Sequence, residues 1–127
     1  MSHKRIYIAA YHQSKFGKLG AMTIPQVVAA AVTETCAAAD ADPAVVDVAS
    51  VGAILTNSLN EQGLLAGLVA GVPGMESKPI EAVENACATG GQAIISVVHK
   101  LLLGYGDVGL AVGFEKMRDA EGKMDGK

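Results

Sequence analysis

Residues 83–93 read Val-Glu-Asn-Ala-Cys-Ala-Thr-Gly-Gly-Gln-Ala, and this stretch decides how the chain folds. It joins a short strand-like run, Ile80 to Val83, to an apolar helix-like run, Ala93 to Leu103. Cys87 therefore lies at a strand-to-helix junction, where unpaired N–H groups and the helix dipole favour a thiolate. Small neighbours leave room for a substrate to approach the sulfur, which is the setting of a nucleophilic cysteine. The alternative is a buried cysteine that packs as a small apolar side chain.

Length and composition limit the kinds of protein that this chain can be. Its 127 residues allow one domain at most, or part of a larger one. The net charge of −3 provides no basic field for nucleic acid or an anionic membrane. No apolar stretch reaches the roughly 18 residues of a transmembrane helix, and the N-terminus lacks the pattern of a signal peptide. We expect a cytoplasmic chain with no nucleic-acid or membrane partner.

Cysteines and histidines are few. Cys36 and Cys87 form no CxxC pair, which argues against a metal site or a disulfide framework. Cys36 follows the apolar spacing of a helix and is expected in the core. His3, His12 and His99 are expected to be solvated or to lie at helix ends. His99 lies roughly 18 Å along its helix from Cys87, which is too far for a catalytic base.

Apolar runs and helical periodicity alternate along the chain. Strands are expected at Ile6–Ala10, Ala49–Leu55, Ile80–Glu84 and Asp107–Phe114. Helices are expected at about 24–39, 61–70 and 89–103, with N-caps at Thr23 and Asn60, and loops at 11–22 and 56–60. This βαβαβαβ order predicts an α/β fold with a mostly parallel sheet and helices on its faces.

The helix after Cys87 is apolar on nearly every side. A surface helix shows a polar stripe, whereas Ile94, Ile95, Val98 and Leu102 leave little polar face here. We expect this helix to lie between two layers, and one sheet in 127 residues cannot easily bury it all round. The pattern indicates a partner half, so the isolated chain should associate or be poorly soluble.

Three segments carry a resemblance to the thiolase superfamily. Residues 84–91 (Glu-Asn-Ala-Cys-Ala-Thr-Gly-Gly) resemble its nucleophile motif. Residues 107–117, with Gly-Phe-Glu-Lys-Met at 113–117, resemble the following strand and turn in sterol-carrier-protein-type and archaeal thiolases. Residues 62–66 resemble the helix before the nucleophile strand. The resemblance assigns residues 1–119 to an incomplete amino-terminal half-domain and 120–127 to a polar tail or the start of a loop.

The resemblance implies a fold, a chemistry and an assembly. The fold is a layered αβαβα arrangement of two βαβαβαββ halves, in which the helix after Cys87 packs against its counterpart. The chemistry is acyl transfer from coenzyme A thioesters with no bound cofactor, and Cys87 is the catalytic nucleophile. The assembly is a dimer formed through the strand near Ile80–Glu84.

The remaining catalytic groups of a thiolase are absent from this sequence. Family members supply them from a histidine- or asparagine-containing motif, a Gly-His-Pro motif and a Cys-x-Gly motif, and none occurs here. The N–H of Cys87 can contribute to an oxyanion hole. We expect the acid and base to come from a longer parent polypeptide or a separate chain, and the isolated piece to be inactive in condensation and thiolysis.

Other polar residues near the motifs have structural explanations. Asn57–Ser58 follow a strand end, where ligand loops are common, but loop polarity explains them equally well. Glu84–Asn85 are expected to support the nucleophile turn or the dimer strand, and Glu115–Lys116 to pair at the surface or an interface. Gly90–Gly91 lack the pattern of a phosphate loop and are expected to allow close helix packing and substrate clearance.

Two other functions remain open. The chain can be a non-catalytic scaffold or dimerisation subunit with a thiolase-like fold. It can also belong to a ketosynthase-type condensing enzyme that uses an acyl-carrier protein, although residues 113–117 favour the thiolases.

Overall fold

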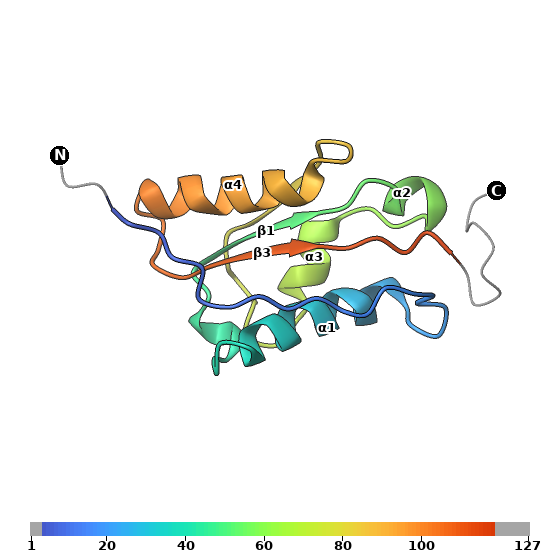
Figure 1. The fold of residues 1–127 in the computed structure, drawn as a ribbon, viewed down its shortest axis with the longest axis horizontal. Helices are drawn as coiled ribbons and strands as arrows, with labels where there is room; N and C mark the ends of the chain where they lie inside the picture. The colour runs from blue at the N-terminus through green and yellow to red at the C-terminus, as the bar shows by residue number, and fades with distance from the viewer. Residues whose placement is uncertain (1–3, 119–127) are drawn as a thin grey trace.

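A computed structural model describes residues 4–118 of the chain. The elements follow one another as a βα alternation preceded by a helix (Figure 1). Their bounds are α1 Ile24–Ala37, the 3₁₀ turn η1 Pro43–Val45, β1 Val48–Gly52, α2 Thr56–Leu59, α3 Leu65–Ala70, β2 Ile80–Val83, α4 Thr89–Leu102 and β3 Gly109–Gly113. The α/β class predicted from the sequence is confirmed.

Three strands form one parallel sheet in the order β2-β1-β3. In its register Gly52 at the end of β1 stands between Val83 of β2 and Gly113 of β3. All five residues of β1 are buried, because this strand is central and both of its faces are covered. Parallel strands end at one edge of a sheet, so the segments that follow all three strands gather there.

Helices cover the two faces of the sheet unequally. Figure 1 shows α1 and α3 on one face and α4 on the other. The larger core lies under α1 and α3, where Val28, Val32, Val69 and Met75 are fully buried. On the opposite face, Val97 and Leu101 of α4 pack on the fully buried Val48 of β1.

A complete capping box begins α1, as the sequence predicted. The Thr23 hydroxyl accepts from the N–H of Gln26, and the Gln26 side chain accepts from the N–H of Thr23. Pro25 lies in the first turn, where its missing N–H breaks no helical bond. Helix α1 ends at Ala37, two residues before the predicted end.

The strand predicted at Ile6–Ala10 does not form. The segment pairs with no strand in the described chain, although Ile6 packs against the cluster under α4. Lys4 anchors the segment through its ammonium group, which lies 3.1 Å from the carbonyl of Gly106 and 3.0 Å from the carboxylate of Asp107. A strand needs a neighbouring edge for its N–H and C=O groups, and side-chain contacts do not supply one.

The helix predicted from Glu61 to Ala70 is shorter than expected. Glu61 and Leu64 both have φ near 53°, a left-handed conformation that interrupts a right-handed helix, so α3 begins only at Leu65. The predicted N-cap Asn60 instead donates its amide to the carbonyl of Lys116 at 3.0 Å. The preceding residues, predicted as a loop, form the single turn α2.

Only one side of α4 is covered in the described chain. Its buried residues are Thr89, Ala93, Val97 and Leu101, which recur every four residues. On its other side Ile94 is 54% exposed, and Ile95 and Leu102 are each 49% exposed. Gln92, Ser96, His99 and Lys100 recur at helical spacing and form a polar stripe, so the helix is less uniformly apolar than predicted. No second layer lies over its exposed apolar residues within residues 4–118.

Candidate functional site

The candidate site is a pocket of about 300 Å³ at the edge where the parallel strands end. Three segments, far apart in sequence, meet around it. One segment is residues 52–54 at the end of β1, and another is residues 113–115 at the end of β3. The segment at the start of α4 contributes Ala86, Cys87, Thr89 and Gly90. Cys87 is among the lining residues, and so are Phe114 and Glu115. The pocket therefore lies beside Cys87, the residue predicted from the sequence to be functional.

Cys87 is exposed and lies in the turn between β2 and α4. The N-cap of α4 is Ala88, so Cys87 comes one residue before the cap. The strand-to-helix position expected from the sequence is confirmed. The alternative of a buried Cys87 is excluded within this chain, since the side chain is not part of the core.

A strained turn presents Cys87. Ala86 has φ 44°, in the left-handed region that non-glycine residues rarely adopt. The Glu84 carboxylate accepts from the Ala86 N–H, and the N–H of Ala88 donates to the carbonyl of Asn85 at 2.9 Å. Glu84 and Asn85 thus support the turn that carries Cys87, which is one of the two structural roles expected from the sequence.

Thr89 ties this turn together from the inside. Its hydroxyl accepts from the N–H of Asn85 at 2.8 Å and donates to the carbonyl of Ala86 at 2.7 Å. Thr89 is only 4% exposed, so the hydroxyl side of both bonds is buried, whereas Asn85 and Ala86 are exposed. Gly52 makes room for Thr89, because a Cβ at position 52 would lie 2.5 Å from the Thr89 methyl carbon.

The N-terminus of α4 opens toward the pocket. No side chain caps its first turn, and there is no acidic residue in that turn to neutralise its positive end. Gly90, which lines the pocket, has open space where a side chain would stand. Such a helix end offers N–H donors and a partial positive charge to a thiolate or an oxyanion. This is the chemistry that attack by Cys87 on a carbonyl needs.

Glu115 has a role that the sequence did not predict. Surface or interface pairing was expected, but its carboxylate accepts from the backbone N–H groups of Ile54 and Leu55, the latter at 3.3 Å. This contact links the end of β3 to the segment after β1, and both segments line the pocket. The run Gly-Phe-Glu-Lys-Met at 113–117 was the feature of the sequence that drew attention to Glu115. The residues that Glu115 bonds could not be predicted from it, because Ile54 and Leu55 lie 61 and 60 residues away.

The second cysteine lies apart from the site. Cys36 is buried in α1 within the larger core, as predicted. Burial raises the pKa of the Cys36 thiol above its ordinary value, and the Asp42 carboxylate adds to that increase. Burial and the raised pKa together make Cys36 less reactive than an exposed thiol.

Other polar residues considered from the sequence lie outside the pocket. His12 pairs with Glu34 of α1, with 2.6 Å between Nε2 and the carboxylate, and His99 lies in the last turn of α4. Asn57 and Ser58 are exposed on α2 and do not line the pocket either. His3 and the tail at 120–127 fall outside the described residues.

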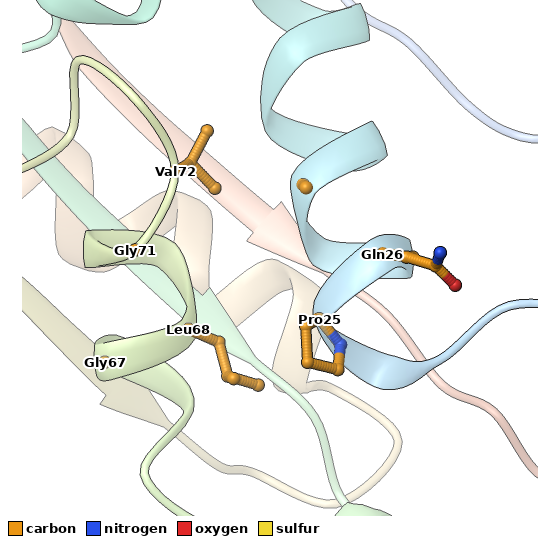
Figure 2. A pocket seen from close by; sticks show the side chains of 7 residues that line it. Pro25, Gln26, Gly67, Leu68, Gly71 and Val72 are labelled. Carbon is orange, nitrogen blue, oxygen red and sulfur yellow. The ribbon is translucent and has the colours of Figure 1, made fainter.

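A second pocket, of about 380 Å³, lies between α1 and α3 (Figure 2). Leu68 points from α3 toward Pro25 at the start of α1, and Gly67 and Gly71 widen the gap. It contains no acid, base or nucleophile. Across residues 4–118, no helix is long and apolar enough to cross a membrane, and no three potential metal ligands come together.

The chain is similar to known proteins over nearly its whole length. Residues 6–126 match the thiolase N-terminal domain. The chain is 30% identical over 114 residues to a protein of Methanothermobacter thermautotrophicus, and 32% identical over 114 residues to one of Methanocaldococcus jannaschii, both named acetyl-CoA acetyltransferase. These alignments cover 90% of this chain but only 30% and 29% of the relatives, so the chain spans about 30% of their length. With the parallel α/β fold and the pocket beside Cys87, the family match leads to one conclusion: the chain belongs to the thiolase family, as its N-terminal domain.

Proposed function

We propose that this chain carries the nucleophile of a thiolase-type acyl-CoA C-acyltransferase. The Cys87 thiolate attacks the thioester carbonyl carbon of an acyl-CoA. A bond forms between that carbon and the Cys87 sulfur, the bond to the coenzyme A sulfur breaks, and coenzyme A leaves as a thiolate. The observation that supports this step best is the exposed Cys87 in a pocket beside the uncapped end of α4.

The second half of the reaction needs an acid or base beyond Glu115, which lines the pocket but whose carboxylate accepts from the N–H groups of Ile54 and Leu55. Thiolysis of the acyl-enzyme, or its condensation with a second acyl-CoA, requires an acid or base near the α-carbon or the attacking thiol. No histidine in residues 4–118 lines the pocket. We propose that the rest of a longer polypeptide, or another subunit, supplies these groups.

The same missing part would complete the assembly. The exposed side of α4, with Ile94, Ile95 and Leu102, is the surface that a second half would cover. Strand β2 lies at the edge of the sheet, and its Ala82 is exposed. An unpaired edge is a template for another strand, so we propose that residues 80–84 pair with a second copy.

Acylation of the purified chain tests the nucleophile. The chain is incubated with acetyl-CoA at neutral pH, and intact mass with peptide mapping locates any acetyl group. We expect one acetyl group on Cys87 and none on Cys36, since burial keeps the latter thiol protonated. Cys87→Ala should abolish labelling, and Cys36→Ala should retain it. Absence of a Cys87 thioester would count against the enzyme.

A scaffold without catalysis is the second candidate, and the lack of a histidine at the described pocket favours it. The two functions differ in how fast iodoacetamide alkylates Cys87. An activated nucleophile reacts faster than an ordinary exposed thiol at neutral pH. Alkylation of Cys87 at the rate of an ordinary thiol, without acetylation, would support the scaffold. Acylation by an acyl-carrier-protein thioester but not by acetyl-CoA would instead indicate a ketosynthase-type enzyme.

A further inference from the structure

A buried hydroxyl is among the groups that hold the turn carrying Cys87, beside the Glu84 carboxylate and the backbone bonds of the turn. Thr89 is 4% exposed, and its Oγ1 both accepts from the Asn85 N–H and donates to the Ala86 carbonyl. The two distances are 2.8 and 2.7 Å. Both hydrogen-bonding functions of the hydroxyl are therefore directed to the backbone just before Cys87.

The backbone at this point needs such a restraint. Ala86 is in the left-handed region, with φ 44°, a conformation that is unfavourable for a residue with a Cβ. Strained conformations persist only where surrounding contacts fix them. Cys87 itself is exposed, so packing of its own side chain does not hold the sulfur in place.

Thr89 also joins the turn to the sheet. Its methyl group faces Gly52 so closely that a Cβ at position 52 would lie 2.5 Å from it and 3.2 Å from the Thr89 carbonyl oxygen. The Thr89 hydroxyl thus bonds the backbone of the turn, while the Thr89 methyl group packs against Gly52 at the end of β1. The positions of Cys87 and of the β1 end, which both line the pocket, depend on each other through this residue.

We propose that Thr89 is a positioning residue that directs Cys87 toward the thioester. It acts through the backbone of Asn85 and Ala86 and takes no part in bond making. The inference rests on the proposed role of Cys87 as the nucleophile. A valine at position 89 keeps the shape and the methyl contact but loses both hydrogen bonds, whereas a serine keeps both bonds and loses the methyl group.

The test compares Thr89→Val and Thr89→Ser with the unmodified 127-residue chain, well below their unfolding temperatures. Three rates are measured for each protein: acetylation of Cys87 by acetyl-CoA, alkylation of Cys87 by iodoacetamide, and amide hydrogen exchange at Asn85. Thr35→Val is the control, because its hydroxyl bonds only the Ala31 carbonyl within α1.

We expect Thr89→Val to lower the acetylation rate at least about tenfold, since small misplacements of a reacting group are costly. Thr89→Ser should stay within about threefold of the unmodified chain, which is a small change in barrier. Exchange at Asn85 should accelerate in the valine variant and remain slow in the serine variant. Thr35→Val should match the unmodified chain in all three measurements.

Equal acetylation rates in all variants, or unchanged exchange at Asn85 in Thr89→Val, would overturn the inference while leaving the proposed function intact. If the unmodified chain is not acetylated, the proposed function fails. The rates of Cys87 alkylation by iodoacetamide then test the role of Thr89 separately. Slower alkylation in Thr89→Val but not in Thr89→Ser supports the positioning role, and equal rates refute it.

Discussion

The contact between Gly52 and Thr89 allows a sharp prediction about the end of β1. In Gly52→Ala the new Cβ would stand 2.5 Å from the Thr89 methyl carbon, well inside van der Waals contact. Neither group can move freely, because β1 is the central strand and Thr89 is hydrogen-bonded on its other side. Overpacking of this kind costs about 1–3 kcal/mol. Loss of the glycine's freedom in the unfolded chain offsets about 0.4–1 kcal/mol.

The expected net loss is about 1–2 kcal/mol of unfolding free energy, which lowers Tm by roughly 3–8 °C for a domain of this size. Urea and thermal unfolding followed by circular dichroism measure it. Gly113→Ala is a matched control, since Gly113 is the register partner of Gly52 and its Cβ would meet nothing closer than 4.0 Å. The control should be as stable as the parent or slightly more stable.

A double variant tests the cause of the loss. Thr89→Ser removes the methyl group that the new Cβ would meet, so Gly52→Ala should cost less in that background, with a coupling of about 1 kcal/mol. Gly52→Ala should also slow acetylation of Cys87, because it displaces the turn. The reasoning is refuted if Gly52→Ala unfolds like Gly113→Ala, or if the two changes at positions 52 and 89 simply add.

Other contacts give further expected outcomes. Gly109→Ala would place a Cβ 2.3 Å from Val97 Cγ1, so it should destabilise the chain by about 1–3 kcal/mol, and Val97→Ala should relieve part of that loss in urea unfolding. Hydrogen bonds from the N–H groups of Val108 and then Asp107 lower the pKa of Asp47 below its ordinary 3.8, so its contribution is present above that pH and lost as pH falls below it. The difference in stability between the parent and Asp47→Asn should therefore shrink on acidification below about pH 4, and a constant difference would contradict this. Cys36 should resist iodoacetamide until urea unfolds the chain, and rapid modification of the folded protein would show that the core is open.

Several features of the fold could be predicted because their signals are local. The capping box at Thr23 and Gln26 depends on residues three apart, and it formed as expected. The strands at β1, β2 and β3 are short apolar runs between helical segments, which is the pattern of a parallel sheet. The position of Cys87 between β2 and α4 also follows from neighbouring residues alone.

The two predictions that were wrong, the strand at Ile6–Ala10 and the N-cap at Asn60, depend on contacts that local sequence does not determine. Ile6–Ala10 has the composition of a strand, but a strand forms only where its N–H and C=O groups pair with a neighbouring strand, and local composition does not determine that pairing. Asn60 has the chemistry of an N-cap, but its amide is engaged by the Lys116 carbonyl, 56 residues away. For Asn60 a contact distant in sequence prevailed over a local preference, and for Ile6–Ala10 the local preference alone did not produce strand pairing.

The sequence by itself determined the alternation of strands and helices, the parallel sheet and the cysteine at a strand-to-helix turn, because periodicity and capping act between residues a few positions apart. Tertiary structure alone decided that Glu115 binds the backbone after β1, that Gly52 admits Thr89, and that only one side of α4 is covered. These contacts join segments separated by tens of residues, and only the packing of the sheet and its helices brings them together.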